Sequence, residues 1–245
     1  MTAPAHLVAP VRLAQGVGAW FTGRAADNLA HRRPHQPRHL ARARRAVAAA
    51  AGLRSHDLHF MQQVHGAEVG VVTDDTAVGA ELRGVDVLVT ATPGRALVVQ
   101  VADCVPVLLA ASDGPVAVVH AGRRGLRAGV VQAALDGVAA LGAPPSSVRA
   151  AIGPSIGGCC YEVPPQLRDT FAAEHPAAAA TTTWGTPSLD LPAAVSSILE
   201  SAGARVVSGP PGCTRCDPDL RWFSHRADPS AGRQAGIVVR RRGRD

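Results

Sequence analysis

The stretch RALVVQVADCVPVLLAA, residues 95–111, decides how this chain folds. It is apolar along almost its whole length, and its many Val and Leu residues favour buried strands. Near its centre lie Asp103, Cys104 and Pro106, and a proline has no N–H to donate to a central ladder. The stretch therefore predicts two buried strands with a break between them, and it places Cys104 at that break.

Two histidines follow strand-like segments elsewhere in the chain. Residues 59–64 predict a strand that leads into His65 in the sequence QVHG, and GPVAVVHAG predicts a buried strand that ends at His120. Side chains at the ends of neighbouring strands meet at one edge of a sheet, so His65, Cys104 and His120 are expected to converge. Asp103 stands beside Cys104 as a candidate hydrogen-bond acceptor or general base.

Two chemistries suit this set of residues. Two imidazoles and one thiolate are the donors of a catalytic zinc site whose fourth position stays open for water or substrate. The same residues suit a metal-free enzyme in which Cys104 is the nucleophile and His120 is its base. The residues by themselves leave both alternatives open, and copper shares this donor set with zinc.

The remaining segments predict an α+β fold. Helices and strands mix without strict alternation and no linker divides the chain, so residues 1–245 are expected to form a single domain. Helices are expected over residues 37–51, 124–142 and 189–203, the last capped by Asp190, with a short helix after Pro164. Further strands are expected within residues 7–21, 68–73, 84–90, 148–158 and 205–216 and at the C-terminal end, and residues 172–187 are expected to form a loop.

Composition and charge exclude several classes of protein. The chain has 245 residues and a net charge of +6, but many arginines lie in terminal runs such as VVRRRGRD, and aromatic residues make up only 3%. Such runs are typical of solvated tails, so no nucleic-acid partner is expected. No apolar run approaches the ~18 residues of a membrane span, and no signal peptide is recognisable. A cytoplasmic protein is therefore expected.

The chain has five cysteines, of which four lie outside the candidate site. An odd count with an adjacent pair favours reduced thiols. Cys159 and Cys160 are neighbours, which makes shared binding of one metal difficult. Cys213 and Cys216 have CxxC spacing, a weak zinc signal without a clear second pair. Packing or loop roles are expected for these four, with a structural metal as the alternative.

Three glycine-containing turns carry arginine or serine. They are GRRG at residues 122–125, GPSIGG at 153–158 and SHRADPSAGR at 224–233. Backbone amides beside guanidinium groups suit a phosphate or another oxyanion. The chain has neither a Walker A nor a GxGxxG pattern, which argues against nucleoside triphosphates and dinucleotides.

Taken in order, QVHG, ADC-P-L, HAG-RG-L, IGPSIGGCCYEV and FSHR-D-GR-AG resemble the laccase-domain family over roughly residues 21–238. Members of that family are described as polyphenol oxidases, peptidoglycan editing factors or multifunctional purine nucleoside phosphorylases. The resemblance implies a central mixed β-sandwich with flanking helices, similar to the catalytic domain of the cytotoxic necrotising factor toxins. Those toxins use Cys and His in glutamine deamidation, which keeps the nucleophile alternative open.

The resemblance also implies a site and an activity. Its metal ligands fall on His65, Cys104 and His120, with zinc as the ion and copper as the alternative. The implied activities are phosphorolysis of adenosine, inosine and methylthioadenosine and deamination of adenosine, by a monomer acting on nucleosides and phosphate. His65, Cys104, His120 and Asp103 are then the candidate catalytic residues, and the candidate substrate or phosphate ligands are Arg24, Asn28, Gln63, Arg124 and Arg226.

The chain departs from the family pattern at three places. Arg123 stands where the family has Trp, and Ala227 stands where a second Arg usually follows the first. The N-terminal motif matches only at Arg24 and Asn28 in FTGRAADNLAHR. Two rival functions accompany the phosphorylase hypothesis: copper-dependent polyphenol oxidation, and a Cys-dependent hydrolase or amidase acting on peptidoglycan precursors. The chain lacks the HxH pairs of a multicopper oxidase, which weakens the first rival.

Overall fold

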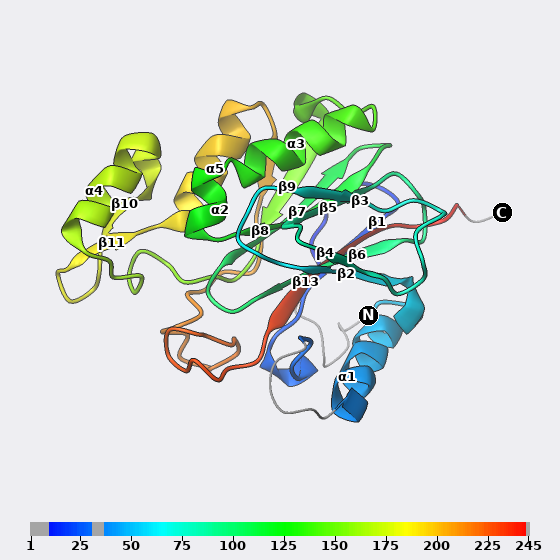
Figure 1. The fold of residues 1–245 in the computed structure, drawn as a ribbon, viewed down its shortest axis with the longest axis horizontal. Coiled ribbons are helices and arrows are strands. Elements are labelled where there is room, and N and C mark those ends of the chain that lie inside the picture. Colours follow the sequence, from blue (N-terminus) through cyan, green and yellow to red (C-terminus); the bar gives the residue numbers. More distant parts are fainter. Residues whose placement is uncertain (1–9, 31–36, 244–245) are drawn as a thin grey trace.

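Two large mixed sheets dominate the computed structural model, which describes residues 10–30 and 37–243 (Figure 1). In spatial order, the first sheet contains β1 (Val17–Phe21), β13 (Gln234–Arg240), β6 (Ala96–Val101), β2 (Leu58–Gln62) and β4 (Glu81–Arg83). The second contains β12 (Arg205–Val207), β9 (Val148–Ile152), β7 (Val105–Ala111), β8 (Val116–Ala121), β5 (Val87–Thr90) and β3 (Val69–Val71). A separate pair joins β10 (Ala179–Thr181) to β11 (Pro187–Leu189). Each large sheet has both parallel and antiparallel neighbours.

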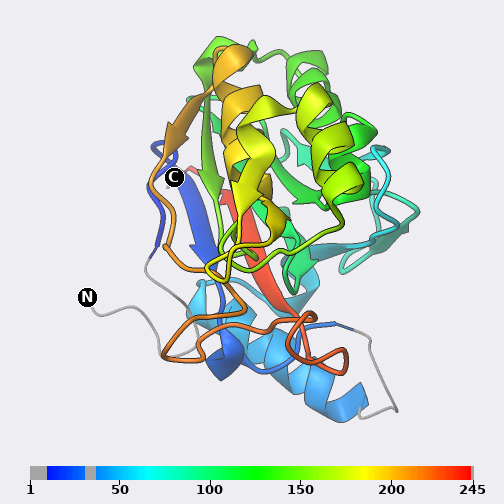
Figure 2. The ribbon, with the colours of Figure 1, turned by 90° about the vertical axis from the view of Figure 1, so that its left-hand side faces the viewer.

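Helices cover both outer faces of the sheets, as Figures 1 and 2 show. The α-helices are α1 (Pro37–Ala50), α2 (Arg123–Arg127), α3 (Val130–Ala140), α4 (Pro165–Glu174) and α5 (Leu191–Ser201). Single 3₁₀ turns are η1 (Arg24–Ala26), η2 (Ser55–Asp57), η3 (Pro145–Ser147) and η4 (Pro176–Ala178). Helix α1 packs on the first sheet, while α3 and α5 pack on the second. The expected α+β class with mixed sheets is confirmed.

The second strand of the stretch at residues 95–111 is apolar throughout because both of its faces are covered. In β7, Leu108 and Ala110 point between the two sheets, where they pack in one cluster with Val99. Val107 and Leu109 point the other way, toward the helices on the second sheet. A strand covered on both faces has no position for a polar side chain. Truncating Leu108 to alanine is expected to cost about 2–5 kcal/mol of folding free energy.

The expected break in this stretch is confirmed, but its position relative to Pro106 is not. Residues 102–104 separate β6 from β7, whereas Pro106 lies inside β7, opposite His120. The carbonyl of Pro106 accepts from Gly153 N–H at 2.9 Å, just beyond the end of β9. His120 N–H turns instead to the Asp86 carbonyl at 2.8 Å. The strand pairing therefore requires no hydrogen bond from the nitrogen of Pro106, and this central strand can contain a proline at that position.

Other expectations also needed correction. The single helix expected over residues 124–142 is divided into α2 and α3, because Gly129 adopts a left-handed φ of 81°. The loop expected over residues 172–187 includes the end of α4, η4, β10 and the first residue of β11. The strand expected within residues 7–21 begins only at Val17 in the described part, and residues 7–9 lie outside it. Three-residue strands such as β4 and β10 are too short to show a periodic pattern.

The helix expected to begin after Asp190 is confirmed. Asp190 Oδ1 accepts a hydrogen bond from Ala193 N–H at 2.9 Å, which satisfies one of the free amides at the start of α5. In the described parts of the chain, none of the helices combines the length and apolar character needed to cross a bilayer.

Candidate active site

The two histidines and Cys104 meet at one end of the second sheet. His65 follows β2, Cys104 lies in the break before β7, and His120 is near the end of β8. One ligand atom from each lies within 4.8 Å of the others. Cys104 Sγ is 3.7 Å from His65 Nε2, and the two imidazole rings meet edge to face with centroids 4.6 Å apart. The structure thus brings together three side chains that are remote in sequence.

A buried carboxylate, Asp86, organises this arrangement. His120 Nδ1–H donates to Asp86 Oδ1 at 2.7 Å, which leaves His120 Nε2 for a metal or a substrate. The backbone amides of Val64, His65 and Gly66 also donate to this carboxylate, at 3.1, 2.9 and 2.7 Å. These three bonds hold the loop in which His65 adopts a left-handed φ of 65°. Asp86 therefore positions both histidines at once.

Asp86 has no solvent exposure, and an isolated buried charge is costly unless it is paired. The sequence places it near the start of a strand, without indicating its partner. The sequence nevertheless contains an indication that this residue is paired: it is the single acidic residue in the apolar run VDVLVT, near the start of that run. A carboxylate in such a place requires donors nearby, and the loop around His65 supplies them.

The electrostatics of the metal-free site favour an ion pair. Burial opposes ionisation of Cys104, but the charge of His120 and hydrogen bonds from both histidines lower its pKa to about 6. Burial likewise opposes the charging of His120, but the Cys104 thiolate and Asp86 raise its pKa to about 9. At neutral pH, Cys104 is then a thiolate beside an imidazolium. The thiolate is the form of cysteine that binds metals and attacks electrophiles.

Gly122 allows the three side chains to approach one another. A Cβ atom at this position would lie 2.8 Å from His65 Cδ2 and 3.1 Å from Cys104 Sγ. Gly122 is also the residue that precedes α2. Its lack of a side chain, rather than its backbone freedom, is what the site requires, because its φ of −85° is ordinary.

Two pockets adjoin at this site and share Ala102, Cys104 and His225 in their linings. The larger has a volume of about 520 Å³ and is also lined by His65 and His120. The smaller has a volume of about 210 Å³. The other residues lining the larger pocket are Ala30, Met61, Gln62, Gln63, Glu81, Gln100, Val101, Arg124 and Arg233. The other residues lining the smaller pocket are Asp103, Arg123, Ile156, Tyr161, Leu191 and Arg226.

Gln63 and Arg124, both predicted to contact substrate, line the larger pocket. The Gln63 amide group is bound to the backbone of Gln100: its Nε2–H₂ donates to the carbonyl at 2.7 Å, and its Oε1 accepts from the amide at 2.9 Å. Gln63 thus ties the loop of His65 to β6. Arg124 comes from α2, directly after the strand that carries His120.

Asp103 and Arg226 line the smaller pocket, and they are connected to each other. Asp103 accepts from the hydroxyl of Thr214 and from the backbone amide of Arg226, each at 2.6 Å. The Arg226 guanidinium donates to the Glu162 carbonyl at 3.1 Å and lies 5.1 Å from the ring centre of Tyr161. Asp103, itself at a left-handed φ of 82°, therefore anchors the segment that carries Arg226.

Arg24 and Asn28 are not among the residues that line these two pockets. The Arg24 guanidinium lies 5.4 Å from the ring centre of Phe223. Asn28 Oδ1 accepts from the amides of Ala30 at 3.1 Å and Arg233 at 2.9 Å, and these two residues line the larger pocket. Asn28 therefore supports the pocket wall from behind. Direct substrate contact by Arg24 or Asn28 stays a prediction.

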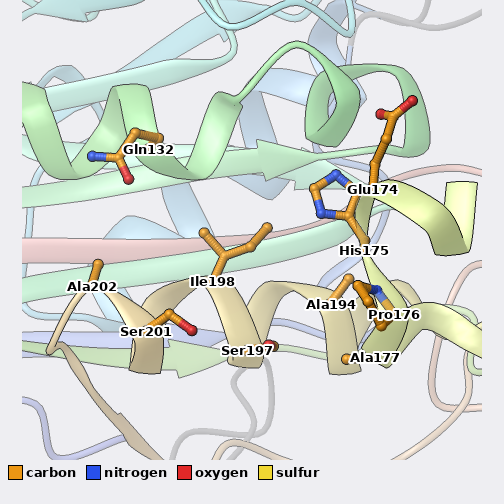
Figure 3. A pocket seen from close by; sticks show the side chains of 10 residues that line it. All are labelled: Gln132, Glu174, His175, Pro176, Ala177, Ala194, Ser197, Ile198, Ser201 and Ala202. Carbon is orange, nitrogen blue, oxygen red and sulfur yellow. The ribbon is translucent and has the colours of Figure 1, made fainter.

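A third pocket, of about 380 Å³, lies beside α5 and the Glu174–Ala177 segment (Figure 3). Its ionisable lining residues are Glu174 and His175, and Glu174 already forms an ion pair with Arg127 at 3.1 Å. None of the predicted site residues lines it. His65, Cys104 and His120 line the first two pockets instead.

The sequence that forms this fold matches one family of proteins. The sequence model described as "Multi-copper polyphenol oxidoreductase laccase" matches residues 17–241. The chain therefore belongs to this laccase family, which confirms the resemblance noted in its motifs.

Relatives of known name and structure agree with this assignment. A purine nucleoside phosphorylase of Streptomyces coelicolor is 47% identical over 196 residues, covering 80% of each chain. One of Mycobacterium bovis is 42% identical over 212 residues, covering 86% of this chain and 83% of the relative. A crystal structure of a Neisseria meningitidis protein covers 97% of this chain and 100% of its own, with 28% identity and a TM-score of 0.82. YlmD from Geobacillus stearothermophilus covers 98% and 100%, with 27% identity and a TM-score of 0.80.

Proposed function

We propose that this chain is a purine nucleoside phosphorylase whose reaction takes place where the two pockets adjoin. One observation carries the proposal: His65, Cys104 and His120 converge there, with arginine side chains in both pockets. The names of the relatives support the same activity. The proposed substrates are inosine, adenosine and methylthioadenosine together with inorganic phosphate, and deamination of adenosine is proposed as an accompanying reaction.

We assign a zinc ion to the three side chains. Their donor atoms lie within 4.8 Å of one another, and Asp86 leaves His120 Nε2 available, so the site suits a metal with two nitrogen ligands and one sulfur ligand. When bound, zinc supplies Lewis-acid activation of a water molecule or a substrate oxygen. Copper, which the family description names, binds the same donors and is the alternative.

The remaining residues would bind phosphate and move protons. Phosphorolysis breaks the bond between the ribose C1′ and the purine nitrogen and forms a C1′–O bond to phosphate, while the purine takes up a proton. Arg124 lines the larger pocket and Arg226 lines the smaller one, and guanidinium groups suit phosphate oxygens. His225 lines both pockets and is the candidate proton donor to the departing purine. Asp103, whose two oxygens are occupied by Thr214 and Arg226, suits positioning better than proton transfer.

The test is direct product analysis. Purified protein is incubated with inosine and phosphate, and hypoxanthine and ribose 1-phosphate are measured. We expect both products in equal amounts, only with phosphate present, and neither with Cys104→Ala. Hypoxanthine released without phosphate, or by Cys104→Ala at the parental rate, would contradict the proposal. Ammonia release from adenosine tests the accompanying deamination.

The thiolate–imidazolium pair of Cys104 and His120 favours one second candidate, a Cys-dependent hydrolase or amidase acting on peptidoglycan precursors. The two candidates respond differently to reagents. A metal-free hydrolase would lose activity on alkylation of Cys104 and keep it after treatment with a chelator. A zinc-dependent phosphorylase would lose activity in both treatments. Stoichiometric copper with oxidation of phenols would instead support the polyphenol oxidase alternative.

We also retain four further expectations as proposals. They are one domain over residues 1–245, a monomer, a cytoplasmic location, and a fold shared with the catalytic domain of the cytotoxic necrotising factors. Light scattering of the purified chain tests the monomer, and a single cooperative unfolding transition tests the single domain. Absence of salt-dependent DNA binding is expected, because the protein is proposed to act on small molecules.

A further inference from the structure

The four cysteines outside the active site form a second cluster. Cys159 and Cys160 lie in the turn that follows β9, and Cys213 and Cys216 lie in the segment between β12 and β13. Their four sulfurs all lie within 4.8 Å of one another. The adjacent pair therefore lies beside the CxxC pair in one cluster, a proximity that the sequence did not predict. The sequence lacked this signal because the partner pair is a CC dipeptide rather than a second CxxC.

The spacing of the sulfurs suits a tetrahedral ion better than a disulfide. Zinc–sulfur bonds of about 2.3 Å place the sulfurs of a regular tetrahedron about 3.8 Å apart. Cys159 Sγ and Cys216 Sγ are 3.8 Å apart. A disulfide would require about 2.0 Å, and all four cysteines are free thiols in the structure.

The backbone around one sulfur of the cluster, that of Cys213, is arranged for a thiolate. Gly157 N–H donates to Cys213 Sγ at 3.3 Å, and the amides of Arg215 and Cys216 also donate to this sulfur. Such N–H donors stabilise a negatively charged sulfur. On the other side of the cluster, the amides of Cys160 and Tyr161 both donate to the Gly157 carbonyl at 3.0 Å, which closes the turn around the adjacent pair.

The two turns are also joined directly. Ser155 and Cys213 form a parallel β-bridge, and Thr214 N–H donates to the Ser155 carbonyl at 3.0 Å. The sulfurs are therefore brought together by backbone contacts, independently of any bond between them. Two packed turns that each present a pair of thiols are the usual construction of a structural zinc site.

We propose that Cys159, Cys160, Cys213 and Cys216 bind a zinc ion as four thiolates. Four protein ligands leave no position for water or substrate, so this ion is structural. It would fasten the segment between β12 and β13 to the turn after β9. That segment carries Thr214, whose hydroxyl donates to Asp103 at 2.6 Å, and further along it carries His225 and Arg226. The ion thereby holds one wall of the active-site pockets in place.

Metal content of matched variants tests this proposal. Protein purified under reducing conditions, without added metal, is analysed for zinc per chain as the parent, Cys216→Ala, Cys216→His and Cys104→Ser. Histidine is an accepted zinc ligand, so Cys216→His is expected to keep the ion that Cys216→Ala loses. The expected result is that Cys216→Ala holds one zinc fewer than the parent, and Cys216→His the same number. Cys104→Ser is expected to keep the structural ion, which separates this proposal from the active-site assignment.

Two measurements on the parent protein guard against a variant that fails to fold. Stepwise addition of an organic mercurial should release zinc as these four thiols react. Cobalt substituted for zinc should show the intense thiolate-to-cobalt absorption of a tetrathiolate site, and Cys104→Ser should retain it. A parent with no zinc attributable to these thiols would overturn the proposal. So would disulfides among them, or iron in place of zinc.

Discussion

The active site and the four-cysteine cluster hold their cysteine side chains in place by different parts of the fold. His65, Cys104 and His120 lie at or near the ends of sheet strands, and the buried carboxylate of Asp86 orients the two histidines. The four cysteines project from two turns joined by backbone hydrogen bonds. The first site offers three ligands and adjoins two pockets, whereas the second offers four. The comparison teaches that ligand number and access, rather than ligand type alone, separate a reactive centre from a structural one.

The largest expected effect comes from removing one sulfur from each site. Cys104→Ser should lower phosphorolysis by at least about 100-fold, because a direct ligand matters at least as much as its supporting partners. Cys216→Ser should lower the melting temperature by several degrees and reduce activity much less. Steady-state kinetics and thermal unfolding of both variants check this contrast. Equal losses of activity in both would mean that the two sites do not divide their roles in this way.

Asp86→Asn should weaken the active site without touching the cysteine cluster. The substitution removes the charge that orients His120, so affinity for the active-site metal should fall by about 10–100-fold. Competition with a chelator measures that affinity. Asp190→Asn is the matched control, because Asp190 lines neither pocket of the site and Asn caps helices equally well. An unchanged affinity in Asp86→Asn would remove Asp86 from its positioning role.

Gly122→Ala should displace the two ligands that touch its position. The new Cβ would meet His65 and Cys104 below normal contact distance, and misplacement of about 1 Å costs up to about 100-fold in rate. Gly66→Ala is a close control, since its Cβ would come no nearer than 3.6 Å to Asp86 Oδ2. We expect kcat/KM to fall in the first variant and to stay near the parental value in the second. The reverse order would show that contact at Gly122 does not limit the site.

In metal-free protein, Cys104 should react with iodoacetamide over an unusually low range of pH. Its pKa is lowered to about 6, so the thiolate fraction rises as the pH passes 6. The rate should therefore increase about tenfold between pH 5 and pH 7, where an ordinary thiol of pKa about 8.5 is still mostly protonated. Mass spectrometry of the alkylated peptide gives the rate. In His120→Ala the midpoint should move upward, and a midpoint near 8.5 in the parent would contradict the ion pair.

Thr214→Val should produce the smallest effect, and it tests the link between the two regions. The change removes the hydroxyl that donates to Asp103 while leaving Cys213 and Cys216 in place. A hydrogen bond to a charged group contributes about 1.5–3 kcal/mol, part of which the remaining Arg226 contact should retain. We expect a several-fold loss of kcat/KM with unchanged metal content. Full activity in this variant would show that the link has no effect on the reaction.

Much of this site was predictable, because its residues carry local signals. His65, Cys104 and His120 each stand beside small residues at the end of an apolar run, and strand ends converge. Asp86 carried a weaker signal, since a lone acid in an apolar strand requires partners that the sequence does not name. The four-cysteine cluster was missed because two residues of one turn and two of another meet only through the bridge between Ser155 and Cys213.

The sequence by itself determined the α+β class, the buried strands of residues 95–111 and the three residue types of the centre. These follow from local patterns of side chains, which act over a few neighbouring positions. Only the tertiary structure decided that Pro106 fits a central strand, that Asp86 holds both histidines, and that four thiols lie within 4.8 Å of one another. Those outcomes depend on hydrogen bonds and packing between segments far apart in the chain, and no local pattern encodes which segments become neighbours.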